Sequence, residues 1–243
     1  MDNPFDLTGK TILVTGASSG IGKEAARIIS LSGANVILTG RNNERLEEAL
    51  SNLKGDGNLS ISADLTKSDE LSILVDQVPA LDGVVFSAGI TGHLPAKFIG
   101  NEDLSNFFDI NYKAPVLLMS LLLRKKKINS KASLVFLSSI ATKYPYFGGS
   151  LYGSTKAAIE AYSRVLAIEL APKGIRSNCI SPSFVRTPMV EGAAETISKE
   201  VMEKFEKMMP LGFGEPNDVA NAIVYLLSDA SKWVTGSNMV LGG

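Results

Sequence analysis

Short, almost unbroken apolar runs alternate with longer helical patterns along most of the chain, and this alternation restricts the fold more than any other feature. The apolar runs predict strands at Thr11–Thr15, Asn35–Thr39, Leu59–Ala63, Gly83–Ser87, Ser133–Ser138, Arg176–Ile180 and Ser237–Leu241. The helical patterns predict helices at Gly20–Leu31, Asn43–Leu53, Ser68–Gln77, Asp103–Lys127, Gly153–Ala171 and Pro216–Ser228. Apolar runs of this kind are typical of parallel strands that are covered on both faces. The sequence therefore predicts an α/β fold: a doubly wound, mostly parallel seven-stranded sheet flanked by helices.

Size and composition favour one soluble domain over residues 1–243. The chain has 243 residues, a formal net charge of −1, and no internal repeat or break in composition. A charge so close to zero argues against nucleic-acid binding, which normally needs a basic excess. Met1–Lys10 lacks the apolar core of a signal peptide, and the apolar run Val116–Leu123 is too short to span a bilayer. Cys179 is the only cysteine, so we expect a cytoplasmic protein without membrane contact, and no residue cluster has metal-ligand spacing.

Glycines occupy the turn between the first expected strand and the first expected helix. This turn reads Thr15-Gly16-Ala17-Ser18-Ser19-Gly20-Ile21-Gly22. Gly16 allows a tight turn, Gly20 lets the backbone approach a pyrophosphate, and Gly22 lets the helix pack closely on the sheet. The helix N-terminus then offers free N–H groups and a favourable dipole to the phosphates. The turn predicts a dinucleotide site, although any tight turn from a strand to a helix can use glycine.

The second expected strand ends in Leu38-Thr39-Gly40-Arg41-Asn42, with no carboxylate. In dinucleotide-binding folds an acidic residue at this place binds the ribose 2′-hydroxyl of NAD, whereas an arginine accommodates the 2′-phosphate of NADP. The Arg41 guanidinium can hold that phosphate with two hydrogen bonds. The sequence thus favours NADP(H) over NAD(H), and the alternative is that Arg41 is only a surface arginine.

A tyrosine and a lysine lie four residues apart in Tyr152-Gly153-Ser154-Thr155-Lys156, so they share one face of an expected helix. A free phenol has a pKa of about 10. A neighbouring ammonium and a positive nicotinamide ring both favour its deprotonated form. Upstream, the fifth expected strand ends at Ser138-Ser139, where open α/β sheets place their ligands. Taken alone, the spacing of Tyr152 and Lys156 is also common in exposed pairs on helices.

Together with Asn111, these residues make the chain resemble the short-chain dehydrogenase/reductase family over nearly its whole length. The glycine turn has the family's T-G-x-x-x-G-x-G spacing, and Asn111, Ser139, Tyr152 and Lys156 align with its catalytic set. The resemblance implies a Rossmann-type domain that transfers hydride between the nicotinamide of NADP(H) and a carbonyl or alcohol. Ser139 would stabilise the substrate oxygen, and Tyr152 would exchange its proton. Lys156 would hold the nicotinamide ribose and lower the pKa of Tyr152, while Asn111 would anchor a water molecule or merely distort its helix.

The resemblance also implies which residues contact the cofactor. Asp64 and Leu65 match the family's adenine-contacting pair, although Asp64 is equally suited to cap the next helix. Ser87 and Ser183 depart from the family pattern, which has asparagine and glycine at these places. Residues 188 to about 199 would form a lid over the substrate. The full set of expected cofactor contacts is Gly16, Ser18, Ser19, Gly20, Ile21, Gly22, Arg41, Asp64, Leu65, Ala88, Gly89, Tyr152, Lys156, Pro182, Val185 and Thr187.

The last residues of the chain resemble one branch of this family in particular. The Thr235-Gly236 turn and the final Gly242-Gly243 are similar to the 3-oxoacyl-[acyl-carrier-protein] reductase branch, except that Leu241 stands where an aspartate is usual. The expected substrate is therefore a small-molecule or acyl-thioester carbonyl. A dehydrogenase for sugars, steroids or other small alcohols, and a non-catalytic NADP-binding protein, are the alternatives. The helices at Asp103–Lys127 and Gly153–Ala171 carry more apolar surface than one sheet face covers, which predicts a homo-oligomer, a tetramer in this family.

Overall fold

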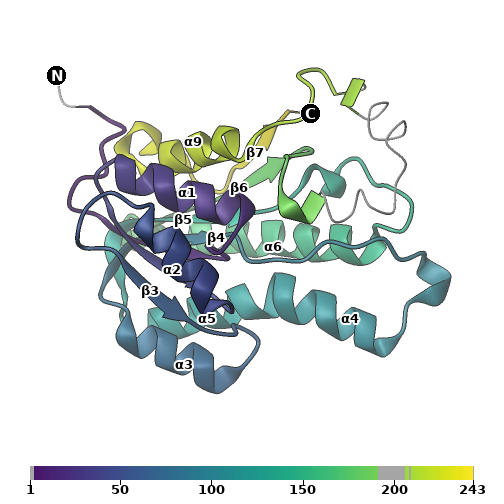
Figure 1. Cartoon of the computed structure of the whole chain (residues 1–243), viewed down its shortest axis with the longest axis horizontal. Helices are drawn as coiled ribbons and strands as arrows, with labels where there is room; N and C mark the ends of the chain where they lie inside the picture. Colours follow the sequence, from purple (N-terminus) through teal and green to yellow (C-terminus); the bar gives the residue numbers. More distant parts are fainter. Residues whose placement is uncertain (1–2, 191–205, 208, 243) are drawn as a thin grey trace.

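The computed structural model describes residues 3–190, 206–207 and 209–242, and its centre is a sheet of seven parallel strands (Figure 1). The strand order is β3-β2-β1-β4-β5-β6-β7, and every neighbouring pair is parallel. All the expected strands form, which confirms the predicted fold class. The strands are β1 (Thr11–Thr15), β2 (Asn35–Gly40), β3 (Leu59–Ser62), β4 (Leu81–Phe86), β5 (Ile128–Leu137), β6 (Arg176–Pro182) and β7 (Asn238–Leu241).

Helices cover both faces of the sheet, and each face has its own core of buried Ile, Leu, Val and Ala side chains. One face packs against α1 (Gly20–Leu31), α2 (Asn43–Ser51) and α9 (Pro216–Leu227). The other face packs against α3 (Ser68–Gln77), α5 (Ala114–Arg124) and α6 (Ser150–Glu169). Further helical segments whose bounds lie within the described residues are α4 (Asn101–Phe108), η1 (Ala96–Phe98), η2 (Asp109–Lys113), η3 (Ile140–Thr142), η4 (Ala171–Lys173) and η5 (Asp229–Ser231). No helix in the described part of the chain is both long and apolar enough to cross a membrane.

The helix predicted over Asp103–Lys127 forms with other bounds and is not a regular α-helix throughout. Residues 101–124 are helical without a gap, as α4, a π-helical turn at η2, and α5, and Lys127 precedes β5. Pro115 has no N–H to donate to the carbonyl of Asn111 four residues earlier, so a regular α-helix is interrupted here. The interruption includes Asn111 itself, and single π-helical turns are often found at functional sites.

The strand order reverses between β1 and β4, because the chain runs outward from β1 to β3 and then returns to the other side of β1. In open α/β sheets, ligands bind in the crevice outside the carboxyl ends of the strands at such a reversal. The carboxyl ends of β1, β4, β5 and β6 bring Gly16, Ser87, Ser139 and Pro182 to this edge. Motifs that are far apart in the sequence therefore meet at one place.

Candidate active site

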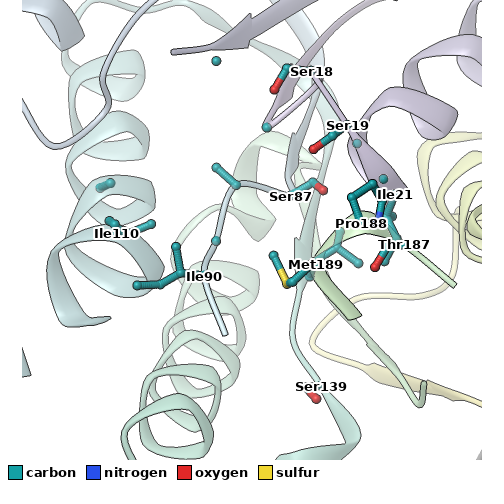
Figure 2. A pocket seen from close by; sticks show the side chains of 18 of the residues that line it. Ser18, Ser19, Ile21, Ser87, Ile90, Ile110, Ser139, Thr187, Pro188 and Met189 are labelled. Atoms are coloured by element: carbon teal, nitrogen blue, oxygen red, sulfur yellow. The ribbon is translucent and has the colours of Figure 1, made fainter. Parts of the chain in front are cut away.

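A cavity of about 300 Å³ lies at this edge of the sheet (Figure 2). Every residue expected to contact the cofactor lines it, and so does Ser139, whereas Asn111 does not. Figure 2 shows Ser18 and Ser19 toward one end of the pocket and Ser139 toward the other. The lining residues that the sequence did not predict include Gly40, Ala63, Thr66, Ile90, Ile110, Ala114, Leu137, Ser138 and Val190.

Close packing requires two of the glycines in the turn after β1. Gly16 has a φ of +66°, and a Cβ there would stand 2.8 Å from the backbone of Ala88. A Cβ on Gly22 would stand 2.3 Å from the carbonyl oxygen of Gly16. Gly20 also has a positive φ, +53°, but its Cβ would meet only the side chain of Thr187, at 3.4 Å. Gly16 and Gly22 thus hold β1, α1 and the segment after β4 together, while Gly20 sets the backbone direction at the start of α1.

The start of α1 fits a dinucleotide pyrophosphate. Ser19 precedes the helix without capping it by a side-chain hydrogen bond, and the first turn contains no acidic residue. The first N–H groups of a helix have no partner within the helix, and its dipole favours negative charge there. Ser18, Ser19 and Gly20 line the cavity at this point. The residues present therefore suit a phosphate group.

Arg41 is exposed at the rim of the cavity, directly after β2. The next residue is Asn42, an amide whose oxygen caps α2 by accepting from the Arg45 N–H. The end of this strand therefore carries an arginine and an amide, and no carboxylate. Asp64 does not cap α3. Its carboxylate instead accepts hydrogen bonds from the hydroxyl and N–H of Thr66, at 2.7 and 3.0 Å. These bonds hold the pKa of Asp64 below its usual value, and the positive charge of Arg41 adds to the effect.

Ser87 and Ser183, which depart from the family pattern, do not disrupt the contacts between neighbouring strands. Thr15 Oγ1 accepts hydrogen bonds from the N–H groups of Ser87 and Ala88, both at 3.1 Å, and so ties β1 to the end of β4. The hydroxyl of Ser183 donates to the sulfur of Met209, at 3.1 Å. The backbone N–H of Ser183 still bonds to the carbonyl at the end of β7. Both serines line the cavity, so they change the side chains that face it and leave the backbone hydrogen bonds around it in place.

Ser139, Tyr152 and Lys156 meet at the end of the cavity away from Arg41. Ser139 follows β5 with extended backbone angles, and its Oγ accepts a hydrogen bond from the N–H of Ala141 at 3.2 Å. That bond leaves the hydroxyl proton of Ser139 free to be donated. Tyr152 and Lys156 both project from α6, and the side chains of Ser139 and Tyr152 lie within hydrogen-bonding reach. The hydroxyl groups of Ser139 and Tyr152 can therefore both hydrogen-bond to one substrate oxygen.

Burial controls the ionisation of this group. It raises the pKa of the Tyr152 phenol, and the nearby Ser139 hydroxyl only partly opposes the rise. It lowers the pKa of Lys156 from 10.5 to about 8, because a buried ammonium loses its hydration. The Lys156 Nζ donates to the carbonyl of Leu137 at 2.8 Å and lies 5.7 Å from the centre of the Tyr152 ring. In the protein alone, burial therefore outweighs the Ser139 hydrogen bond and raises the pKa of Tyr152, while its lowering by Lys156 and a positive nicotinamide ring together stays a prediction.

Asn111 is buried behind the cavity, and its side chain is bonded to protein atoms. Its amide oxygen accepts from the N–H of Ile90 at 2.8 Å, and its amide nitrogen donates to the Ile90 carbonyl at 3.0 Å and to Thr155 Oγ1 at 3.1 Å. The side chain thus fixes the backbone just after Gly89 against α6. A contact of Asn111 with a water molecule stays a prediction.

Sequence reasoning missed the apolar part of the cavity, which Ile90, Ile110 and Val190 form together with Met189. Two of these were open to inference, because Ile90 directly follows the Ala88-Gly89 pair and Ile110 directly precedes Asn111. Residues 191–199 of the expected lid lie outside the described residues. In the described ranges, no three His, Cys, Asp or Glu side chains gather as a metal site.

The fold, the glycine-rich turn after β1 and the Ser139–Tyr152–Lys156 group are together typical of a nicotinamide-dependent oxidoreductase. Residues 16–243 match a family model described as enoyl-(acyl carrier protein) reductase. The chain is 35% identical to the 3-oxoacyl-[acyl-carrier-protein] reductase FabG of Rickettsia felis over 240 residues, covering 98% of each chain. It is 30% identical to an NAD-dependent glycerol dehydrogenase of Listeria innocua over 247 residues, covering 100% of this chain and 96% of the relative.

A solved structure gives the same result. A short-chain type dehydrogenase/reductase from Mycobacterium ulcerans superposes with a TM-score of 0.88 at 32% identity, covering 97% of this chain and 89% of that one. The chain belongs to the short-chain dehydrogenase/reductase family. Members of this family act on carbonyl or alcohol groups with a nicotinamide cofactor.

Proposed function

We propose that this protein uses NADPH to reduce the ketone of an acyl thioester to an alcohol, as its 3-oxoacyl-[acyl-carrier-protein] reductase relatives are named for doing. The observation that carries this proposal is the pair of hydroxyls, Ser139 and Tyr152, at one end of a cavity whose other end carries Arg41 and the open start of α1. One end suits a carbonyl oxygen and the other suits phosphates. The two ends of the cavity therefore suit a dinucleotide with its substrate beside the nicotinamide.

NADPH, when bound, supplies the hydride. The protein supplies orientation and a proton. The Ser139 hydroxyl donates a hydrogen bond to the substrate oxygen and stabilises the negative charge that develops on it. Tyr152 gives its phenolic proton to the same oxygen, and the raised pKa keeps that proton on the phenol at neutral pH. Lys156, whose Nζ donates to the Leu137 carbonyl, would hold the ribose next to the nicotinamide.

The apolar wall favours an acyl substrate. Ile90, Ile110 and Val190 line the cavity with Met189, and apolar side chains suit a hydrocarbon chain better than a polyol. Similarity to a glycerol dehydrogenase keeps a small alcohol as the second candidate. The two differ in direction as well as substrate, because the second is an oxidation.

Turnover assays decide between these functions. The purified protein is mixed with NADPH and acetoacetyl-CoA or simple ketones, and separately with NADP⁺ or NAD⁺ and glycerol, sugars or steroid alcohols. We expect the fastest turnover with NADPH and acetoacetyl-CoA. Faster turnover of an alcohol would replace the proposal with the second candidate. No turnover with any of them would favour a non-catalytic binding protein.

Tyr152→Phe tests the proton donor. The change removes one hydroxyl and keeps the ring, so we expect reduction to slow by about 10²–10⁴-fold while NADPH affinity changes little. Tyr144→Phe is the matched control, because that phenol is exposed on the surface. Near-normal reduction by the Tyr152→Phe protein would show that another group donates the proton.

A further inference from the structure

Glu160 is a buried carboxylate with no part in the chemistry proposed above, yet it lies directly behind the residues that perform it. Only 9% of its surface is exposed. It follows Tyr152 and Lys156 on α6 at successive spacings of four residues, so the three side chains lie along one face of the helix. Burying a carboxylate is costly unless its oxygens accept hydrogen bonds. Its hydrogen-bond partners therefore indicate its role.

These partners lie on both sides of Ser139. Glu160 Oε1 accepts from Ser138 Oγ at 2.7 Å and from Thr142 Oγ1 at 3.0 Å. Ser138 precedes Ser139, and Thr142 ends the short helical turn η3 that begins just after it. One carboxylate oxygen thus ties both ends of the Ser139 turn to α6. The same oxygen lies 3.3 Å from Ser181 Oγ, which adds a contact to the end of β6.

The hydrogen bonds of Glu160 fix the separation of Ser139 from Tyr152, on which the proposed catalysis depends. Ser139 stands after β5 and Tyr152 on α6, so their separation depends on how the turn is held against the helix. Glu160 provides that hold from the helix that carries Tyr152. Without it, the turn keeps the bond from the Ser138 N–H to the Ile180 carbonyl and the internal bonds that Ser139 accepts from the N–H groups of Ala141 and Thr142. Its remaining hydrogen bond to α6 is then the 3.4 Å contact from Ser138 Oγ to the Lys156 carbonyl. A displacement of about 1 Å between reacting groups can slow catalysis by roughly a hundredfold.

We propose that Glu160 is a positioning residue that holds the Ser139 turn against α6, so that the hydroxyls of Ser139 and Tyr152 reach the same substrate oxygen. This inference rests on the roles proposed for those two hydroxyls. The carboxylate acts through Ser138 and Thr142 and touches neither the substrate nor the cofactor. It links the two elements that carry the catalytic hydroxyls.

Three substitutions separate this role from a general effect on folding. Glu160→Leu removes the acceptor, Glu160→Gln keeps one carbonyl oxygen of similar reach, and Glu169→Leu removes an exposed carboxylate from the same helix as a control. For acetoacetyl-CoA and NADPH, we expect kcat to fall roughly ten- to hundredfold in Glu160→Leu. We expect Glu160→Gln to recover most of that loss, and Glu169→Leu to leave kcat unchanged. The dissociation constant for NADPH should change little in all three.

Amide hydrogen exchange of the cofactor-free protein gives a readout that does not depend on turnover. The N–H groups of Thr142, Lys143 and Tyr144 bond to carbonyls within the Ser139 turn. We expect them to exchange faster in Glu160→Leu than in the wild type, and at the wild-type rate in Glu169→Leu. Unchanged exchange in Glu160→Leu would overturn the inference. If that protein does not fold, Thr142→Val removes one tie and must show the same faster exchange at smaller size.

A double-mutant cycle with Ser139→Ala completes the test. If Glu160 acts through Ser139, then Glu160→Leu costs little further activity once the Ser139 hydroxyl is gone. An undiminished cost in the Ser139→Ala background would overturn the inference and leave the proposed function standing. Wild-type turnover by Ser139→Ala alone would instead overturn the proposed function, and the positioning role would fall with it.

Discussion

Arg41 is the residue on which the choice between the two nicotinamide cofactors depends. It is exposed at the rim of the cavity, and no carboxylate stands beside it at the end of β2. NADH lacks the phosphate that a guanidinium would hold there. We therefore expect Arg41→Ala to weaken NADPH binding at least tenfold, or about 1.4 kcal/mol, and to leave NADH binding unchanged. Fluorescence titration with both cofactors measures this, with Arg45→Ala, an exposed residue of α2, as the control. Wild-type protein that bound NADH as tightly as NADPH would contradict the assignment.

Burial of the Lys156 ammonium lowers the free energy of unfolding of the protein. Its pKa falls to about 8 in the folded protein from 10.5, so the unfolded chain binds more protons between these values. The stability of the wild type should therefore rise with pH across that window, and the buried ammonium costs most below about pH 8. We expect Lys156→Met to raise the free energy of unfolding at pH 7, by an amount on the order of 1–3 kcal/mol, while turnover is lost.

Urea unfolding of both proteins checks this expectation. The advantage of Lys156→Met should shrink as the pH rises from about 8 toward 10.5, because the wild-type lysine then becomes neutral in the folded state. Lys173→Met, at an exposed position, should show neither effect. A loss of stability in Lys156→Met at pH 7 would mean that the bond to the Leu137 carbonyl outweighs the cost of burial.

Among the elements, the π-helical turn η2 is held to its neighbours by Asn111. That side chain satisfies both backbone groups of Ile90 and bonds to Thr155 on α6. Asn111→Ala removes the bonds to both partly buried backbone groups of Ile90 and leaves the Thr155 hydroxyl only its bond to the Tyr152 carbonyl, so we expect the free energy of unfolding to fall by about 1–3 kcal/mol. Chemical denaturation measures the loss, with Asn106→Ala at an exposed position of α4 as the control. Equal stabilities for the two variants would show that the segment after Gly89 is held in some other way.

The same elements show what the sequence could and could not predict. The strands were predictable because parallel strands buried on both faces need apolar runs, and β1 has the predicted bounds. The π-helical turn between α4 and α5 is not predicted because apolar periodicity continues across it, although Pro115 follows directly. The start of β5 is predicted at Ser133 and not at Ile128, because the polar residues 129–131 interrupt its apolar run. In the structure, Ile128 pairs with Leu81 of β4, and the Asn129 side chain donates to Asp82.

Some features of the candidate site could likewise be predicted from the sequence, and others could not. Motifs with fixed spacing, such as the glycine turn and the Tyr152–Lys156 pair, were predictable, and the structure brings them to one cavity. Burial, which raises the pKa of Tyr152 in the protein alone, could not be read from the motif. Glu160 was missed because its partners, Ser138 and Thr142, reach it only once β5 packs on α6. The catalytic and cofactor roles of the predicted residues stay predictions until the variants above are measured.

For the whole molecule, one domain and a homotetramer stay predictions, and the outer surface supports the second. The helices on the face opposite α1 and α9 leave large apolar side chains uncovered: Leu104, Leu117, Val165 and Ile168 are 44%, 40%, 50% and 77% exposed. Grouped apolar side chains on a surface mark contacts between proteins, whereas scattered ones do not. The distribution therefore favours pairing of chains through α4, α5 and α6.

Charge placed in that surface should separate the chains. A buried carboxylate without a partner is costly, so we expect the double variant Val165→Asp, Ile168→Asp to dissociate into smaller species at micromolar concentration and to keep its fold. Leu31→Asp is the control, because that side chain is 49% exposed on α1, which covers the other face of the sheet. Sedimentation equilibrium distinguishes the outcomes. A wild-type protein that sediments as a monomer would refute the tetramer. A double variant that stays tetrameric would move the contact to another face, because two added charges per chain cannot be buried together without separating the subunits.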